Sequence, residues 1–256
     1  MTGTPIIGIT LDIEYSTSYA QEPWYALREN YCGAIETAGG TAIGLPHDLN
    51  AIERYLDLVD GVVISGGMYD IPPALYGEEE RQGDLVTKVH RTRFEQRLLE
   101  GALARDLPVV GICGGMQLIA VSQGAKLIQD LPSEVRSSLG HMQPLPHSEA
   151  SHSVSLTPGS LLHRLVGRER LEVNSVHHQA IKDVPKHLVV SAVAEDHVIE
   201  AIEVPDQRFC IGLQWHPEYL INDSERRVFD ALVEAAAAYR QGLRGHDGAE
   251  RKAGGS

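Results

Sequence analysis

Short apolar runs rich in β-branched residues alternate along the first half of the chain with stretches whose apolar residues recur at helical spacing. Continuous apolar runs of this kind are typical of strands buried on both faces. Strands are predicted at residues 5–10, 41–46, 61–65 and 108–112, and helices at 24–38, 51–59, 85–105 and 116–123. Strands that alternate with helices favour an α/β fold, with a mostly parallel central sheet flanked by helices on both faces.

The pattern changes after Lys126, where strand-like runs follow one another with turns and little helix between them. These runs cover residues 153–156, 188–192, 198–204 and 210–214. They predict a mixed or antiparallel extension of the same sheet. A last helix is predicted over 224–241. We therefore expect one domain over residues 1–242 and a flexible polar tail over 243–256.

Charge and composition narrow the classes of partner. The 256 residues carry 22 Lys+Arg against 35 Asp+Glu, a formal net charge of −13, which disfavours nucleic acid and anionic membranes. No apolar run is long enough to span a bilayer, and the first residues lack the basic region of a signal peptide. The three cysteines are too few and too scattered for a disulfide framework. A cytoplasmic location is the expectation.

The segment PVVGICGGMQLIA at residues 108–120 is the first that points to chemistry. An apolar strand passes straight into a helix through glycines, which places Cys113 on a tight turn at the carboxyl edge of the sheet. The helix N-terminus would stabilise a thiolate, and the backbone N–H of Gly114 could donate to an oxyanion. A buried structural cysteine is the competing interpretation.

A second segment, IGLQWHPEY at residues 211–219, ends another apolar strand. Pro217 stiffens the turn, so His216 and Glu218 can point the same way and pair. A cysteine nucleophile needs a histidine to move its proton and an acid to orient the imidazole. Alone, this segment is more typical of a surface histidine beside a solvated glutamate.

Together, the two segments resemble the class I glutamine amidotransferase superfamily, in which G-x-C-x-G-x-Q carries the nucleophile and W-H-P-E the other two members of a triad. Residues 111–117 and 215–218 match these motifs, with Gln117 at the last position of the first. The resemblance implies a flavodoxin-like fold. It makes Cys113 the nucleophile, His216 the general base and acid, and Glu218 the orienting carboxylate.

Two further segments resemble one branch, the γ-glutamyl-γ-aminobutyrate hydrolase group or peptidase family C26. Residues 66–77 look like its GG-x-x-D/N-x-x-P-x-x-Y segment, and 173–179 resemble V-N-S-x-H-x-Q. The superfamily takes a second oxyanion donor from a glycine after this strand, which makes Gly67 the candidate. The resemblance implies weaker candidates for substrate binding, which are Gly66, Gln117, Asn174, Ser175 and His177.

The chain departs from the branch pattern at two positions. Gly114 stands after the nucleophile, where Arg is frequent, and Thr92 replaces the acid of an Arg-Asp-x-x-Glu pattern. Neither departure touches the triad, but both bear on which substrate is bound.

Twelve histidines raise the question of a metal, especially His141, His147, His152, His177 and His178. No H-E-x-x-H motif or tight His/Asp cluster is visible in the sequence, so we expect no metal and no cofactor. His177 is instead predicted as a pocket residue or a solvated loop histidine.

The leading hypothesis is an enzyme that hydrolyses a γ-glutamyl amide, such as γ-glutamyl-γ-aminobutyrate or a polyamine derivative, through a γ-glutamyl thioester. One alternative is a glutaminase subunit that supplies ammonia to a separate synthase partner. A second alternative is a non-catalytic binding protein on the same fold. The expected partner is a small molecule, a homodimer is possible, and the sequence does not specify the amine half of the substrate.

Overall fold

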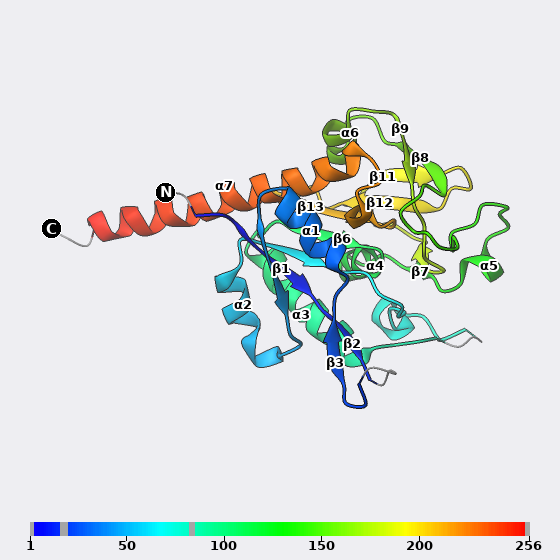
Figure 1. Ribbon diagram of the computed structural model, residues 1–256, viewed down its shortest axis with the longest axis horizontal. Coiled ribbons are helices and arrows are strands. Elements are labelled where there is room, and N and C mark those ends of the chain that lie inside the picture. Colours follow the sequence, from blue (N-terminus) through cyan, green and yellow to red (C-terminus); the bar gives the residue numbers. More distant parts are fainter. Residues whose placement is uncertain (1–2, 16–19, 82–84, 254–256) are drawn as a thin grey trace.

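The structure, a computed structural model, describes residues 3–15, 20–81 and 85–253, and it confirms the predicted fold class. One sheet of eleven strands runs through the molecule in the order β4-β1-β5-β6-β13-β12-β11-β8-β9, with β10 joined to β12 and β7. Strands β2 and β3 form a separate hairpin. Figure 1 shows helices on both sides of the sheet, with α7 along one face.

The strands are short, as expected for buried runs between turns. They are β1 (Ile6–Thr10), β2 (Asp12–Glu14), β3 (Trp24–Ala26), β4 (Thr41–Leu45), β5 (Gly61–Ile64), β6 (Val109–Ile112), β7 (Leu127–Ile128), β8 (His152–Leu156), β9 (Arg170–Val173), β10 (Ala180–Ile181), β11 (Val189–Ala194), β12 (Ile199–Glu203) and β13 (Cys210–Leu213).

The helices are α1 (Glu29–Thr37), α2 (Ile52–Leu58), α3 (Val89–Ala104), α4 (Gly114–Ser122), α5 (Leu131–Glu134), α6 (Leu161–Val166) and α7 (Asp223–Ala253). Three 3₁₀ helices accompany them, η1 (Leu49–Ala51), η2 (Pro73–Tyr76) and η3 (Pro217–Tyr219). None of the helices among these residues is long and apolar enough to cross a membrane.

The direction of the strands divides the sheet in two. Strands β4, β1, β5, β6 and β13 are parallel, whereas β12, β11, β8 and β9 continue the sheet in antiparallel pairs. The change of direction lies between β13 and β12. It matches the predicted change of pattern in the second half of the sequence. The parallel strands therefore bring their carboxyl ends to one edge.

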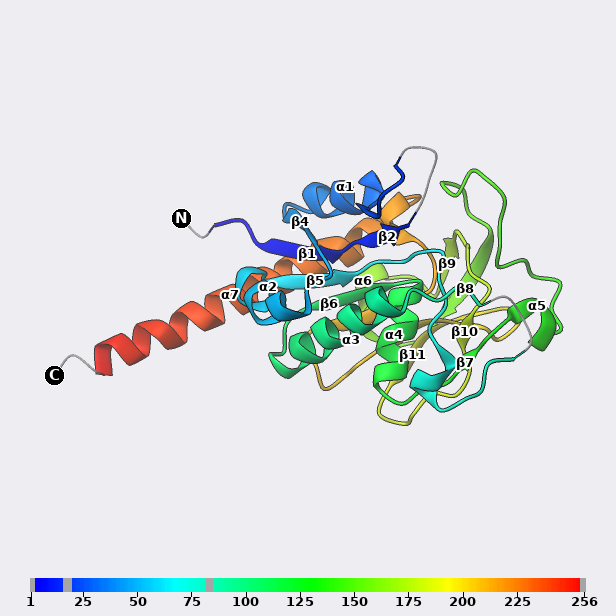
Figure 2. The same cartoon turned by 90° about the horizontal axis from the view of Figure 1, so that it is seen from below.

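Two apolar clusters cover the two faces of the sheet. Successive side chains of β5 point to opposite faces of the sheet and so belong to different clusters. Val63 lies in the cluster under α1 and α7, while Val62 and Ile64 lie in the cluster under α2, α3 and α4. Figure 2 shows α1 and α3 on opposite sides of the parallel strands. Burial on both faces explains why these strands read as continuous apolar runs in the sequence.

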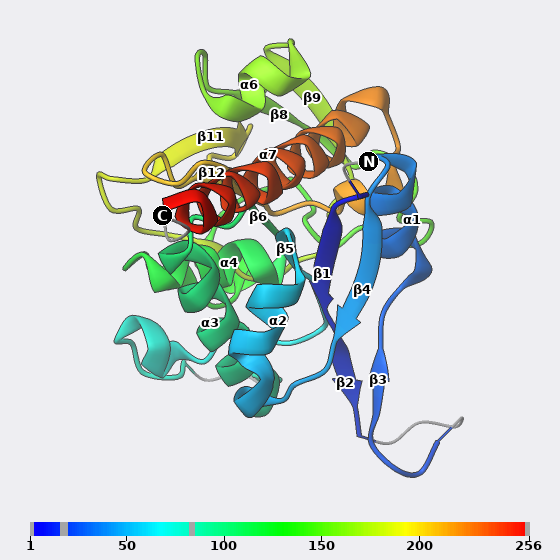
Figure 3. The same ribbon diagram turned by 90° about the vertical axis from the view of Figure 1, so that its left-hand side faces the viewer.

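Two predicted elements differ from the structure. The helix predicted over 24–38 begins only at Glu29, because residues 24–26 form β3, which pairs with β2 in a hairpin beyond the main sheet (Figure 3). The final helix, predicted over 224–241, continues to Ala253. Residues 242–253 contain no proline and include Ala249, Glu250, Arg251 and Lys252, which favour helix.

Helix α4 packs directly against the sheet because three glycines remove the side chains between them. A Cβ on Gly115 would lie 2.1 Å from the carbonyl oxygen of Ile64. A Cβ on Gly111 would lie 2.6 Å from the Gly115 oxygen, and one on Gly212 would lie 2.7 Å from Met116. The sequence of β6, β13 and α4 thus sets how closely the helix approaches the strands.

We expect Gly115→Ala to destabilise the protein by about 3 kcal/mol, since the new methyl group meets backbone that cannot move without displacing β5. The matched control is Gly33→Ala in α1, where the new Cβ meets no atom within 4 Å beyond the adjacent residues and the helix's own backbone. The control should stabilise the protein by up to about 1 kcal/mol, because alanine favours helix. Urea denaturation measures both. Equal stability of Gly115→Ala and the wild type would contradict this view of the α4 contact.

Candidate active site

Cys113 lies at the junction of β6 and α4, where the strand becomes a helix without an intervening loop. Its backbone is held at φ 52°, ψ −109°, a left-handed conformation that is rare for residues other than glycine. Such a residue typically costs about 1–3 kcal/mol and persists only where the surroundings impose it. The Cys113 amide donates to the Leu213 carbonyl of β13 at 2.7 Å, and the side chain is 6% exposed. This is the sharp turn that the glycine pattern predicts.

His216 and Glu218 come from the end of the neighbouring strand β13. Ile112 and Leu213 are in register across β6 and β13, so the chain leaves both strands at the same edge of the sheet. His216 Nδ1 lies 2.8 Å from Glu218 Oε1, and both side chains are buried. A Cβ on Gly66 would meet Cys113 Cβ and His216 Cε1 at 3.2 Å each. The three predicted triad residues therefore come together around one point.

The environment of His216 favours its protonated form. Burial alone would lower the pKa of His216, but the Glu218 carboxylate and the Cys113 sulfur outweigh burial and raise that pKa well above its ordinary value. Because Nδ1 faces Glu218, Nε2 is left for the thiol. The pair can thus hold a proton next to Cys113 at neutral pH.

Two hollows meet beside these residues. One is bordered by Cys113, Gly114 and Gln117, and the other by His216 and Gly66, while Gly67 borders both. Val176 and Met68 also lie between the two hollows. The Gly66 amide donates to the Tyr31 hydroxyl at 3.0 Å, so it is occupied within the protein. Gly67 and Gly114, the two predicted oxyanion donors, lie on the hollow that contains Cys113.

The weaker substrate-binding candidates divide into two groups. His177 and Gln117 border the Cys113 hollow, as Gly66 borders the other. Asn174 and Ser175 are fully buried and border neither hollow. Asn174 Oδ1 accepts from the His216 amide at 2.8 Å and its Nδ2 donates to the His216 carbonyl at 3.0 Å. Its contacts thus fix the His216 backbone. Ser175 Oγ donates to the His141 carbonyl.

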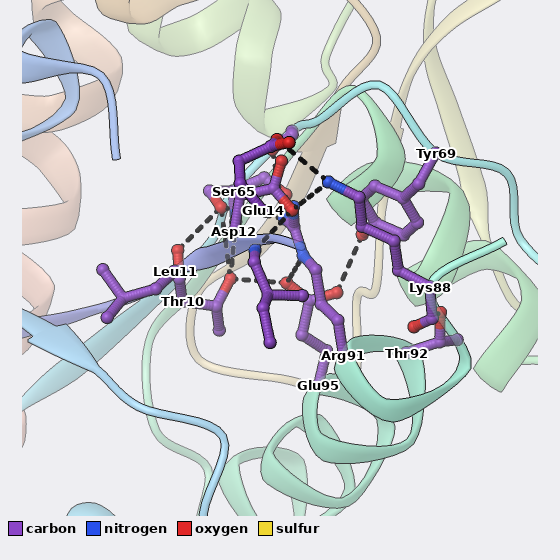
Figure 4. A network of polar contacts seen from close by, with 12 residues as sticks. Thr10, Leu11, Asp12, Glu14, Ser65, Tyr69, Lys88, Arg91, Thr92 and Glu95 are labelled. Carbon is purple, nitrogen blue, oxygen red and sulfur yellow. Dashed lines mark hydrogen bonds and ion pairs between the residues drawn. The ribbon is translucent and has the colours of Figure 1, made fainter. Parts of the chain in front are cut away.

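Figure 4 shows a network of ion pairs and hydrogen bonds around Arg91, at the start of the loop after β5. Arg91 of α3 is fully buried; its Nε lies 2.9 Å from Glu95 Oε1, and its Nη1 lies 2.9 Å from Asp12 Oδ1. Its Nη2 donates to the carbonyl oxygens of Ser65 and Gly66 at 2.8 and 3.1 Å. The guanidinium thus ties α3 to the end of β5.

Aromatic and hydroxyl groups complete this network. The guanidinium carbon of Arg91 lies 4.2 Å from the centre of the Tyr69 ring, and the Tyr69 hydroxyl donates to Glu95 Oε2 at 2.8 Å. Thr10 Oγ1 donates to Glu95 Oε1 at 2.7 Å. Burial alone would lower the pKa of Arg91, but Glu95, Tyr69 and Asp12 raise it, so the residue stays charged.

Arg91, Glu95 and Tyr31 are not among the site residues that the sequence predicts. A signal was present for the first two, because Arg91 and Glu95 share a helix face with Phe94 and Leu98 and interrupt an otherwise apolar stripe. Tyr31 carries no such signal, since a tyrosine in an amphipathic helix is ordinarily a core residue.

The two departures from the branch pattern have separate structural settings. Thr92 is buried, and its Oγ1 donates to the carbonyl of Lys88, the residue that caps the start of α3. At Gly114, an added Cβ would lie 3.4 Å from the Tyr69 hydroxyl, an ordinary contact. A longer side chain at position 114 would therefore lie next to Tyr69.

The histidines singled out in the sequence have different surroundings. His178 pairs with Asp70, its Nε2 lying 2.7 Å from Oδ1, and His147 packs near Tyr219. In contrast, His141, His152 and His177 converge on Glu200. No such cluster is visible in the sequence, because these residues lie far apart along the chain and meet only across the antiparallel half of the sheet.

We expect Arg91→Met to cost about 3–5 kcal/mol, because it leaves the Glu95 carboxylate buried and unpaired. The double variant Arg91→Met/Glu95→Gln should recover part of that loss. Arg97→Met is the matched control on the same helix: its ion pair with Glu100 is exposed, so its loss should cost less than about 1 kcal/mol. Denaturant unfolding of all three compares them. The network has no such role if Arg91→Met and Arg97→Met are equally stable.

Known proteins resemble this chain over most of its length. The family model of peptidase C26 matches residues 5–218. A γ-glutamyl-γ-aminobutyrate hydrolase of Escherichia coli strain K12 is 33% identical over 244 residues, which cover 90% of this chain and 93% of that protein. A protein of Rickettsia prowazekii provisionally described as glutamine amidotransferase-like is 35% identical over 92% of this chain and 99% of its own length.

Among solved structures, a Thermoplasma acidophilum protein provisionally described as one of the subunits of a GMP synthase superposes with a TM-score of 0.65 at 17% identity, covering 94% of this chain and 99% of that one. This likeness concerns the fold, which is that of the glutamine amidotransferases. With the family model matched over most of its length, the chain belongs to the peptidase C26 family of class I glutamine amidotransferase-like proteins.

Proposed function

We propose that this protein is a cysteine-dependent hydrolase that cleaves a γ-glutamyl amide to glutamate and a free amine. The observation that carries the proposal is the buried His216–Glu218 pair beside Cys113, at the carboxyl edge of the parallel strands. Membership of a family of C–N hydrolases supports it, as does the likeness to γ-glutamyl-γ-aminobutyrate hydrolases.

The first half of the proposed reaction forms a thioester. The Cys113 sulfur attacks the γ-carbonyl carbon, and a C–S bond forms while the carbonyl oxygen takes the negative charge. The backbone amides of Gly67 and Gly114 are the proposed donors to that oxygen. The protonated His216 transfers its proton to the amide nitrogen, the C–N bond breaks, and the amine leaves.

The second half of the reaction returns the enzyme to its starting state. Neutral His216 accepts a proton from water, and the resulting hydroxide attacks the thioester carbonyl. The C–S bond breaks, glutamate is released, and the Cys113 thiolate is restored beside the imidazolium. Glu218 holds the imidazole in the tautomer that directs Nε2 at the sulfur, and Asn174 holds the His216 backbone.

The hollow beside His216 bears on the amine half of the substrate. Asp12, Glu14 and Arg28 border it, so both signs of charge are available at its rim. A substrate panel should therefore include an amine with a free carboxylate, such as aminobutyrate, and a cationic polyamine. Glutamine belongs in the same panel, because relatives described as glutamine amidotransferases are about as similar to this chain. These relatives favour a second candidate function, in which the protein supplies ammonia from glutamine to a separate synthase.

We expect Cys113→Ala to lower kcat on every active γ-glutamyl amide by more than about 10³-fold, since the thioester cannot form. Cys32→Ala, at a half-buried cysteine of α1, is the control and should retain activity. Glutamate release measures both variants. Activity on γ-glutamyl amines supports the hydrolase, whereas activity on glutamine alone supports the ammonia-supplying function. Retention of activity by Cys113→Ala would refute the mechanism.

The raised pKa of His216 predicts the pH dependence. The value of kcat/KM should stay high through neutral pH and fall as the pH rises through that pKa, because the proton donor to the leaving amine is lost. Glu218→Gln removes the carboxylate that raises this pKa, so the alkaline fall should move to lower pH. A pH–rate profile of wild type and variant tests this. An alkaline fall at the same pH in both proteins would assign it to another group.

A further inference from the structure

Three histidines surround one carboxylate in the antiparallel half of the molecule. His141 precedes β8, His152 begins β8, His177 lies in the loop after β9, and Glu200 is on β12. Glu200 Oε1 lies 3.2 Å from His141 Nδ1, 3.3 Å from His152 Nε2 and 3.6 Å from His177 Nε2. All four side chains are buried, Glu200 completely. Of the four residues, His177 also borders the hollow that contains Cys113.

The facing atoms of this cluster have no hydrogen-bond partners among the described residues. This holds for His141 Nδ1, His152 Nε2, His177 Nε2 and both carboxylate oxygens of Glu200. Buried polar atoms are nearly always satisfied, because an unmade hydrogen bond costs about 1–3 kcal/mol each. Five such atoms in one place call for a group that all of them can bind.

The outward nitrogens of two rings show which inward atoms carry lone pairs. His177 Nδ1 lies 2.9 Å from the Gln179 carbonyl oxygen, which can only accept, so Nδ1 carries the proton. His141 Nε2 lies 3.0 Å from Asp196 Oδ2 and is protonated for the same reason. In the neutral rings, the inward nitrogens therefore present lone pairs to the Glu200 carboxylate. Lone pairs and a carboxylate at this distance repel one another unless a proton or a metal ion lies between them.

The spacing suits a tetrahedral metal ion. Zinc binds imidazole nitrogen and carboxylate oxygen at about 2.0–2.1 Å, so two ligands of a tetrahedral ion are about 3.4 Å apart. The three contacts to Glu200 Oε1, at 3.2, 3.3 and 3.6 Å, lie around that value. The ligand atoms of His141, His152 and Glu200 all lie within 4.8 Å of one another. Moreover, an oxygen acceptor on the outward nitrogen of a ligating histidine is the usual outer contact of a zinc site.

We propose that His141, His152 and Glu200 bind a divalent transition-metal ion, with Zn²⁺ as the occupant. Imidazole favours zinc over magnesium or calcium, which prefer oxygen ligands. Glu200 and Asp196 together offset the two positive charges of the ion. Three protein ligands leave the fourth position of a tetrahedral ion to a water molecule.

The ion would brace one wall of the candidate active site. His177 follows Val176, which borders both hollows. The Val176 carbonyl oxygen lies 3.9 Å from Cys113 Sγ. The three ligands come from the segment before β8, from β8 itself and from β12, and His177 of the loop after β9 lies 3.6 Å from the same Glu200 oxygen. One ion would therefore join three segments and fix the Glu200 carboxylate that His177 of this loop contacts, and its presence does not depend on which substrate is cleaved.

The first test is the metal content of the full chain without a histidine tag, dialysed against metal-free buffer and measured by mass spectrometry. We expect about one zinc per chain. After removal with a chelator, Co²⁺ alone should give the intense visible d–d absorption of tetrahedral coordination, which aqueous Co²⁺ lacks. This readout needs no variant. A chain that retains no zinc and gives no such absorption overturns the proposal and leaves a network of protonated histidines.

Variants identify the ligands. In competition with a chromophoric chelator, Glu200→Gln and His152→Gln should weaken Zn²⁺ binding by more than about 100-fold, and the outer contact variant Asp196→Asn by about 10–100-fold. His187→Gln is the matched control at an exposed histidine and should bind as the wild type does. If Asp196→Asn and His187→Gln bind Zn²⁺ equally well, or if all variants keep one tight zinc, the ion is held elsewhere.

Discussion

The contact between α4 and the sheet is the constraint on which the rest of this structure depends. Gly111, Gly115 and Gly212 let the helix backbone touch the strands, and a single added carbon at Gly115 would lie 2.1 Å from a carbonyl oxygen of β5. With the helix this close, the chain has no room for a loop between β6 and α4, and Cys113 is forced to φ 52°. The strain at one residue is thus maintained by the packing of two whole elements. The same geometry leaves the thiol at the helix N-terminus and at the edge of the sheet.

Two neighbouring strands then decide what lies beside that thiol. Because β6 and β13 are parallel and in register, His216 leaves the sheet at the level of Cys113, although about a hundred residues separate them. The loop after β5 is drawn to the same edge by Arg91, which holds the Ser65 and Gly66 carbonyls from inside the core. Burying this guanidinium would be unfavourable alone, and Glu95, Asp12 and the Tyr69 ring compensate for its lost hydration. The Arg91 network therefore supports the loop after β5, and its residues take no direct part in the proposed reaction.

The antiparallel half of the sheet supplies the remaining wall. In this half, three imidazole rings lie around the Glu200 carboxylate, next to the loop that contains Val176. The parallel half of the sheet positions the candidate catalytic residues through tight backbone turns. The antiparallel half holds the neighbouring loop through a polar cluster in the interior. Both devices meet at the loop of residues 174–179, in which Asn174 secures the His216 backbone and His177 belongs to the cluster.

The sequence by itself determined the α/β class, the central strands to within a residue or two, and the family to which the chain belongs. It could do so because buried parallel strands require continuous apolar runs, and because the turn at Cys113 and the His-Pro-Glu turn at His216 are local motifs. Only the tertiary structure decided that residues 24–26 form a hairpin, that Arg91 is buried beneath the Gly66–Gly67 loop, and that Asn174 binds backbone. It alone brought His141, His152, His177 and Glu200 together. Each of these depends on which distant segments become neighbours, and strand order and register, rather than any local pattern, set that proximity.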